Sequence, residues 1–164
     1  MTITRLPTTI LIIRHGEKPD DHSDLHLSDA GRVRADMLAK TMPAIYPNLS
    51  VLFATAPSTN SNRPYETIAP LAMAMRLVIN NSFSTGQHSE LAERIMRSSE
   101  DYGGKTILIC WHHEKIPGLA RDDFGQEGAP TFWSDDVFDQ IWQIDYSSDG
   151  QSTFTIKPEP PMPN

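Results

Sequence analysis

The sequence predicts one α/β domain, spanning residues 1–164, whose mostly parallel sheet carries helices on both faces. Short apolar runs rich in β-branched residues, typical of buried strands, lie at 8–13, 51–54 and 106–111. Segments with helical spacing of their apolar residues separate these runs. This alternation is typical of βαβ units, in which helices join parallel strands.

The first expected helix covers 29–41. Ser28 is a suitable N-cap, and Pro43 predicts that the helix ends before it. Apolar residues at helical spacing form the face expected to be buried: Val33, Met37, Leu38 and Met42. Charged residues form the face expected to be solvated: Arg32, Arg34, Asp36 and Lys40.

A second helix is expected to open at Pro64, because proline suits the first turn of a helix. Pro70 predicts a kink or a division in this helix. Met73 and Met75 are interpreted as core residues.

The remaining elements are shorter. A short strand is expected at 76–79 and a third helix at 89–99. The segments 141–145 and 153–157 alternate in polarity around a polar turn, which predicts a late hairpin at the sheet edge. The residues from about 158 to 164 form a proline-rich tail.

The composition excludes several classes of partner. A formal net charge of −7 without a Lys/Arg cluster is unsuited to nucleic acid, and no apolar run is long enough to span a membrane. Without a visible secretory signal, a cytoplasmic location is expected. The lone Cys110 lies in an apolar run and is interpreted as a core residue.

Three segments place polar side chains at the expected carboxyl ends of strands, where open α/β sheets hold their ligands. Arg14, His15 and Gly16 follow the first apolar run, and His112 follows the third. Arg63 follows the second run and opens the next helix. We therefore expect these side chains to lie together.

This combination predicts a phosphate-binding site. Arg14 and Arg63 can bind phosphoryl oxygens in bidentate fashion, and a neutral His15 can attack phosphorus. His112 as a cation would stabilise charge on the oxygens. This scheme needs no metal and no cofactor. A metal site built from histidines is disfavoured because their spacing matches no standard ligand set and the arginines would repel a cation.

With these residues the chain resembles the histidine phosphatase superfamily, which is phosphoglycerate mutase-like. The matching segments, in order, are Arg14-His15-Gly16-Glu17-Lys18-Pro19, Leu27-Ser28-Asp29-Ala30-Gly31 with Arg34-Ala35, Arg63-Pro64-Tyr65-Glu66-Thr67 with Pro70-Leu71-Ala72, and His112 with Ile116-Pro117. The resemblance implies a Rossmann-like three-layer αβα sandwich without cofactor. It also implies that Arg14, Arg63 and His112 bind the phosphoryl group while His15 becomes transiently phosphorylated.

The resemblance leaves the proton donor open. Glu90 lies about where one large branch of the family keeps its acid, although inside an expected helix, and Glu114 competes because another branch has its acid just after the second histidine. His113 is expected to pack or to form hydrogen bonds. The chain is too short for the insertions that form lids in mutases, which favours a phosphatase.

The leading hypothesis is a phosphatase that hydrolyses phosphomonoesters on a small phosphorylated substrate or a phosphoprotein. Two alternatives remain at this point. One is a non-catalytic phosphate-binding or regulatory module, and the other is a phosphohistidine-protein phosphatase, whose leaving group depends less on a dedicated acid. The sequence does not indicate the substrate or the oligomeric state.

Overall fold

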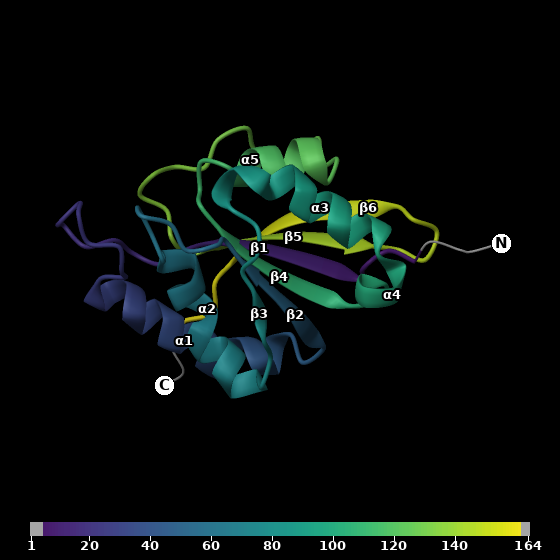
Figure 1. Cartoon of the computed structure of the whole chain (residues 1–164). Coiled ribbons are helices and arrows are strands. Elements are labelled where there is room, and N and C mark those ends of the chain that lie inside the picture. The colour runs from purple at the N-terminus through teal and green to yellow at the C-terminus, as the bar shows by residue number, and fades with distance from the viewer. Residues whose placement is uncertain (1–4, 162–164) are drawn as a thin grey trace.

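The computed structural model describes residues 5–161, which form a single six-stranded sheet in the order β3-β2-β4-β1-β5-β6 (Figure 1). The strands are β1 (Thr9–Arg14), β2 (Leu49–Ala54), β3 (Ile79–Asn80), β4 (Thr106–Trp111), β5 (Gln140–Tyr146) and β6 (Ser152–Pro158). The first four strands pair in parallel, whereas β5 pairs antiparallel with both β1 and β6. The mostly parallel sheet is thus confirmed.

Helices cover both faces of the sheet. The helical segments are α1 (Asp29–Ile45), α2 (Arg63–Met75), η1 (Thr85–Gln87), α3 (His88–Arg97), α4 (Ser99–Tyr102), α5 (Ile116–Gly118) and the π-helical turn η2 (Leu119–Asp123). Figure 1 shows α1 and α2 on one face, and α3, α4 and α5 on the other. This arrangement is the three-layer αβα sandwich that the sequence predicted.

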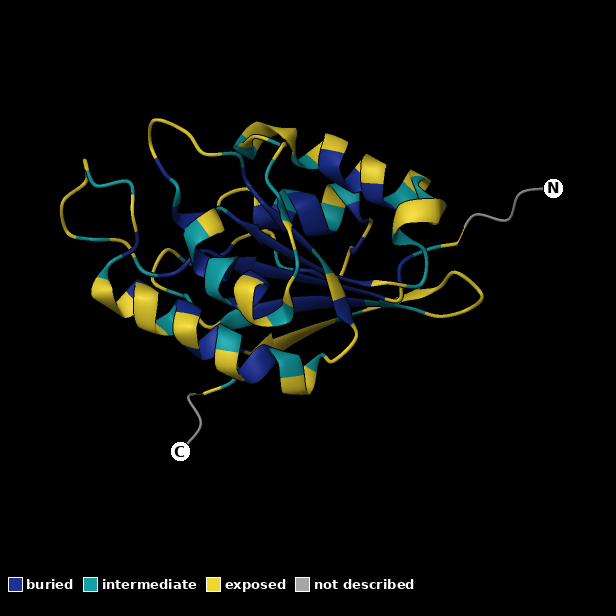
Figure 2. Cartoon of the chain, turned by 60° about the horizontal axis from the view of Figure 1, so that its bottom comes forward, coloured by how far each residue is buried: buried dark blue, intermediate teal, exposed yellow. Residues whose placement is uncertain are grey.

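Two apolar cores lie on either side of the sheet, because successive side chains of a strand point to opposite faces. In β1, Ile10 and Ile12 join the core beneath α3, whereas Leu11 and Ile13 join the core beneath α1 and α2. Buried residues accordingly fill the central strands between two layers that are exposed on the outside (Figure 2). Cys110 is buried in the second core, as expected.

Helix α1 is longer than the sequence predicted, and of its expected buried face Met37, Leu38 and Met42 are buried but Val33 is not. It continues past Pro43 to Ile45, because a proline in the last turn removes one backbone hydrogen bond without preventing the next, from Tyr46 N to Met42 O. Val33 is 57% exposed, because it lies opposite the buried stripe that runs from Gly31 to Met42. The expected end before Pro43 and the expected burial of Val33 are both wrong.

Helix α2 is one continuous helix, so of the two expected effects of Pro70 the division does not occur. Its packing against the core through the fully buried Ile68 and Leu71 compensates for the missing hydrogen bond at the proline. Met73 is 83% exposed and is not a core residue, whereas Met75 packs against the core.

The C-terminal part follows the prediction more closely. Helix α3 begins at His88, β5 and β6 form the expected hairpin, and β6 is the edge strand. The short strand starts at Ile79, because Arg76 ends α2 in a left-handed conformation. Of the expected tail, Pro158 belongs to β6 and Glu159 is buried, while 162–164 lie outside the described residues. Within 5–161, no helix is both long and apolar enough to cross a membrane.

Candidate active site

The structure brings His15 and His112 together at the carboxyl end of two adjacent parallel strands. Arg14, the last residue of β1, pairs in register with Trp111, the last residue of β4. The residues that follow these two strands, His15 and His112, therefore leave the sheet at the same edge. The centroids of the two imidazole rings are 5.2 Å apart. The adjacency expected from the sequence is therefore present.

The backbone of the β1 motif orients His15. Its Nδ1 lies 2.7 Å from the carbonyl oxygen of Gly16, so this nitrogen donates a proton and Nε2 carries the free lone pair. The residue is only 2% exposed. Burial, with smaller contributions from His112 and Arg14, lowers the pKa of His15 to about 3. The ring is thus neutral near pH 7, as a nucleophile requires.

A buried threonine connects this motif to helix α2. The hydroxyl of Thr67 accepts a hydrogen bond from the Gly16 N–H at 2.8 Å and donates one to the Arg63 carbonyl at 2.8 Å. Gly16 itself lies close to α1, because a Cβ built on it would be 3.1 Å from the Cα of Gly31. A side chain at residue 16 would crowd the backbone of Gly31.

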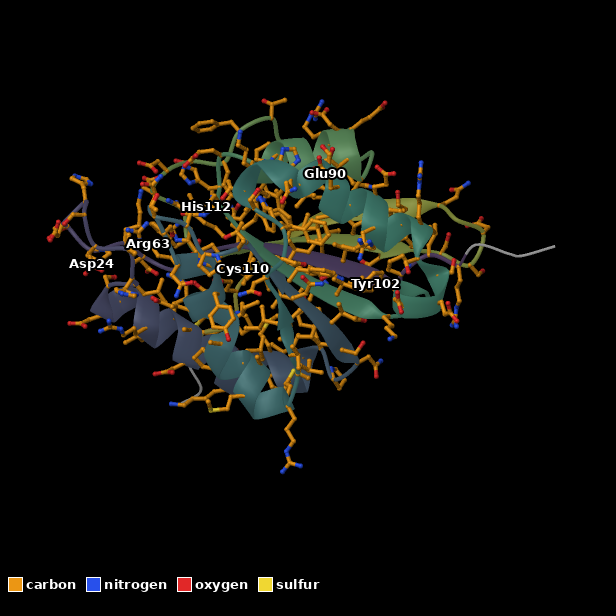
Figure 3. All side chains as sticks on the ribbon, in the orientation of Figure 1. Asp24, Arg63, Glu90, Tyr102, Cys110 and His112 are labelled. Atoms are coloured by element: carbon orange, nitrogen blue, oxygen red, sulfur yellow. The ribbon has the colours of Figure 1, made fainter. Side chains whose placement is uncertain are left out.

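The guanidinium of Arg63 is held by the loop that precedes α1. Its Nε donates to the carbonyl of His26 at 3.0 Å, and its Nη2 donates to the carbonyl of Asp24. Glu66, one turn further along α2, accepts a hydrogen bond from Leu27 N at 2.9 Å and pairs with the His26 ring. Figure 3 shows Asp24, Arg63 and His112 at the same end of the molecule.

These groups surround a cavity of about 490 Å³. His15, Arg63, His112, His113 and Glu114 all line it. The remaining lining residues come from the segment after the β1 motif, the loop after β2 and the segment around η1. The cavity therefore has a floor of buried cationic and imidazole groups at the edge of the sheet.

Arg14 lies beneath this floor and does not line the cavity. Its side chain is fully buried, Nη1 donates to the carbonyls of Asp135 at 2.7 Å and Val137 at 3.0 Å, and the Phe138 ring covers the guanidinium at 3.8 Å. Its Nε and Nη2 have no hydrogen-bond partner among the described residues. Burial lowers the pKa of Arg14, partly offset by Asp135. These two buried nitrogens, neither of which donates a hydrogen bond to a described residue, suit an anion.

Asp135 connects Arg14 to His113. One carboxylate oxygen lies 3.5 Å from Arg14 Nη2 and 3.3 Å from His113 Nε2. The sequence did not identify Asp135 or Phe138 as residues of this site. No local signal marks either residue, because only the return of the chain toward β5 brings this segment against β1.

Without a bound anion, the surroundings of His112 favour the neutral ring, and the cationic form expected at the phosphoryl group stays a prediction. Burial, reinforced by the nearby Arg63, lowers its pKa to about 4, although Glu114 acts in the opposite direction. A bound phosphate dianion would neutralise the arginines and raise this pKa.

Only one of the two candidate acids lies at the cavity. Glu114 lines it, whereas Glu90 is exposed on α3 and lines a separate hollow with Arg94. Figure 3 shows Glu90 on the helix above the sheet, away from Arg63. At the start of α3, the His88 ring lies 2.5 Å from an Asp123 carboxylate oxygen and joins this helix to η2. The structure does not bring Glu90 together with His15.

Metal ligands are not clustered in this region. Within the part of the chain that the structure describes, no group of three or more His, Cys, Asp or Glu side chains is arranged to hold a metal ion.

Similarity to known proteins is found at the level of structure. No family model matches the chain, and no curated protein matches it in sequence. The putative phosphohistidine phosphatase SixA from Agrobacterium tumefaciens is similar, with a TM-score of 0.59 and 13% identity over 92% of this chain and 99% of that chain. A mycobacterial glucosyl-3-phosphoglycerate phosphatase, in complex with inorganic phosphate, has a TM-score of 0.60 and 12% identity over 94% and 98% of the two chains.

A third similar structure is a phosphoserine phosphatase mutant from Entamoeba histolytica in complex with phosphoserine. Its TM-score is 0.60, at 14% identity over 90% of this chain and 94% of that chain. The three comparisons cover 90–94% of this chain. The chain therefore has the phosphoglycerate mutase-like fold, the fold that its motifs predicted.

Proposed function

We propose that the protein is a metal-independent phosphatase that hydrolyses phosphomonoesters through a phosphohistidine at His15. The observation that carries this proposal is the neutral His15 ring, whose Nδ1 is bound to the Gly16 carbonyl and whose Nε2 is left as the nucleophile. His112 lies beside it, and Arg63 lines the same cavity. The three proteins of similar fold are named as phosphatases, which agrees with this assignment.

The reaction proceeds in two displacements. In the first, the lone pair of His15 Nε2 forms a bond to phosphorus while the bond from phosphorus to the leaving oxygen breaks, and Glu114 supplies the proton for that oxygen. In the second, water attacks phosphorus and gives its proton to Glu114, the N–P bond breaks, and inorganic phosphate leaves. Both carboxyl and imidazole groups return to their starting state.

Charge on the phosphoryl oxygens is balanced by fixed groups. Arg63 and His112 contact them from the cavity, and Nε and Nη2 of Arg14, which donate no hydrogen bond to a described residue, provide donors from beneath. Because carbonyl groups already hold the Arg63 guanidinium, binding does not require its reorganisation.

Hydrolysis of p-nitrophenyl phosphate in a buffer containing a chelator tests the proposal. The wild-type protein should hydrolyse p-nitrophenyl phosphate and should yield an acid-labile phosphorylated histidine after rapid quenching. His15→Ala should abolish both signals, whereas His22→Ala, in the exposed loop after the motif, should change neither. Tight phosphate binding without turnover would instead identify a non-catalytic phosphate-binding module.

One observation favours a second candidate, a phosphohistidine-protein phosphatase. The side chain of Glu114 is 68% exposed, so few contacts fix the position of the candidate acid. The leaving group of a phosphoramidate depends less on such an acid. A phosphorylated histidine-containing protein offered as substrate would test this alternative, and failure to dephosphorylate it would contradict the assignment. The cytoplasmic location expected from the sequence stays a prediction.

A further inference from the structure

The segment 24–27 holds the guanidinium of Arg63, although it belongs to no helix or strand. Nε and Nη2 of Arg63 both donate to carbonyl groups of this segment, and the two contacts fix the plane of the guanidinium. Among the described residues, Nη1 has no acceptor, and Arg63 lines the cavity. The direction in which Arg63 offers its remaining donors to an anion therefore depends on where the two carbonyl groups point.

Glu66 is the residue of α2 whose side chain fixes this segment. It lies three residues after Arg63, so the two side chains leave the same face of the helix. One carboxylate oxygen accepts a hydrogen bond from Leu27 N at 2.9 Å, and the other pairs with the His26 ring and accepts a hydrogen bond from Asn62 Nδ2 at 3.3 Å. The side chain of Glu66 is 24% exposed, so these donors largely replace water around the carboxylate.

The start of α2 and this segment are joined in both directions. The backbone N–H of Asn62 donates to the carbonyl of Leu25 at 3.0 Å. The side chain of Asn62 does not cap the helix and donates to Glu66 instead. Removal of the Glu66 carboxylate would leave the N–H of Leu27 and the ring of His26 without their partner on α2. The carbonyl groups that hold the guanidinium would then no longer be fixed from this side.

We propose that Glu66 is a positioning residue for phosphate binding, which acts through Arg63 by fixing the segment whose carbonyl groups hold the guanidinium. The proposal rests on the proposed phosphatase function, in which Arg63 binds the phosphoryl group. Its prediction is opposite in sign to that of charge alone. Removal of a carboxylate near an anion site favours the anion electrostatically, whereas loss of positioning weakens anion binding.

Binding of inorganic phosphate, followed by NMR titration, tests the proposal without requiring turnover. Glu66→Ala should weaken phosphate binding about tenfold, the size of one misplaced hydrogen bond to a charged group. Glu66→Gln, which keeps one acceptor oxygen for Leu27 N, should lose less affinity. Glu93→Ala removes the same charge at an exposed position of α3 and should bind phosphate as the wild type does.

A double-mutant cycle separates positioning from a general effect on the fold. In the Arg63→Ala background, Glu66→Ala should weaken phosphate binding by less than about twofold, because the group that Glu66 positions is absent. A merely structural role would instead give the same loss with and without Arg63. Denaturation in urea shows whether each variant is folded under the conditions of the titration, and Glu66→Gln takes the place of Glu66→Ala in the cycle if the alanine variant is not.

The possible failures are distinguishable. Unchanged or tighter phosphate binding in Glu66→Ala, or an equal loss in both backgrounds, would overturn the role of Glu66 and leave the phosphatase assignment intact. Phosphate binding by a wild-type protein that does not hydrolyse p-nitrophenyl phosphate would overturn the proposed function, while the cycle would still decide whether Glu66 positions Arg63. Absence of phosphate binding by the wild-type protein would overturn both.

Discussion

The hydroxyl of Thr67 joins the segment that carries His15 to the helix that carries Arg63, through its hydrogen bond with the Gly16 N–H. The bond is 2.8 Å long and buried, and the same hydroxyl donates to the carbonyl of Arg63. The peptide that holds the His15 ring is therefore attached directly to the helix that opens with Arg63. The relative placement of His15 and Arg63 depends on this contact.

Replacing Thr67 by valine removes the hydroxyl and keeps the shape of the side chain. Leaving the buried Gly16 N–H without an acceptor costs about 1–3 kcal/mol. We expect kcat of Thr67→Val to fall about tenfold or more, because a small displacement of the nucleophile is costly. Thr67→Ser, which keeps the hydroxyl, should restore kcat. Denaturation in urea measures the loss of stability separately from the loss of kcat. Equal kcat in Thr67→Val and wild type would rule out a positioning role for the hydroxyl.

The histidines should titrate in distinct groups. Burial lowers the pKa of His15 to about 3 and that of His112 to about 4, whereas Glu66 raises the pKa of His26. At about pH 5.5, below the ordinary histidine pKa, His26 should be protonated while His15 and His112 stay neutral. Nitrogen-detected NMR spectra of the imidazoles measure this directly. Saturating phosphate should raise the pKa of His112, and an unchanged value would argue against its contact with the anion.

The positions of the two candidate acids predict unequal effects of their removal. Glu114 lines the cavity of His15 and Glu90 does not. Glu114→Gln should lower kcat for an alkyl phosphate about a hundredfold, the usual contribution of general acid catalysis. It should have a smaller effect on p-nitrophenyl phosphate, whose leaving group needs no proton. Glu90→Gln should match the wild type on both substrates, and a loss confined to Glu90→Gln would reverse the assignment.

Removing the carboxylate of Asp135 should strengthen phosphate binding. This carboxylate lies 3.5 Å from Arg14 Nη2, where it competes for the guanidinium that the substrate would use. Because the carboxylate is exposed, we expect Asp135→Asn to tighten phosphate binding by no more than about fivefold. Asp136→Asn, the same change at the next residue, is the control. Calorimetric titration with inorganic phosphate at low salt provides the measurement, and weaker binding in Asp135→Asn would contradict this reading.

Glu159 should make stability depend on pH. Its side chain, 1% exposed, accepts a hydrogen bond from Arg34 at 3.3 Å, and the same arginine binds both carboxylate oxygens of Glu17 at 2.8 Å. Burial raises the pKa of Glu159 to about 8, partly offset by Arg34. At pH values between the ordinary glutamate pKa and about 8, Glu159 binds its proton more tightly in the folded state than in the unfolded state. The contribution of Glu159 to stability therefore decreases as pH rises through this window.

Glu159→Gln resembles the neutral acid at every pH. The free energy of unfolding of the variant, relative to wild type, should rise by on the order of 1–2 kcal/mol between about pH 5.5 and 7.5. Denaturation in urea at the two pH values measures this difference. The exposed Glu127→Gln should show no such trend. A difference that stays constant with pH would show that Glu159 is ionised throughout.

The strands and the catalytic edge could be predicted because their signals are local. An apolar run such as 106–111 is buried on both faces, and a parallel sheet then brings the carboxyl ends of neighbouring strands together. That geometric rule was sufficient to place His15 beside His112. Helix ends were less predictable, since packing against the core can outweigh the local effect of Pro43 or Pro70.

The sequence by itself determined the order of strands and helices and the residues that reach the active edge. Only the tertiary structure decided how those residues are held: Thr67 bound to Gly16, Arg14 covered by Phe138, and Glu90 turned away from the cavity. The physical reason is the distance along the sequence over which each kind of interaction acts. Propensity and hydrophobic periodicity act between neighbours along the chain, whereas these contacts join segments far apart in sequence that meet only once the sheet and its helices have packed.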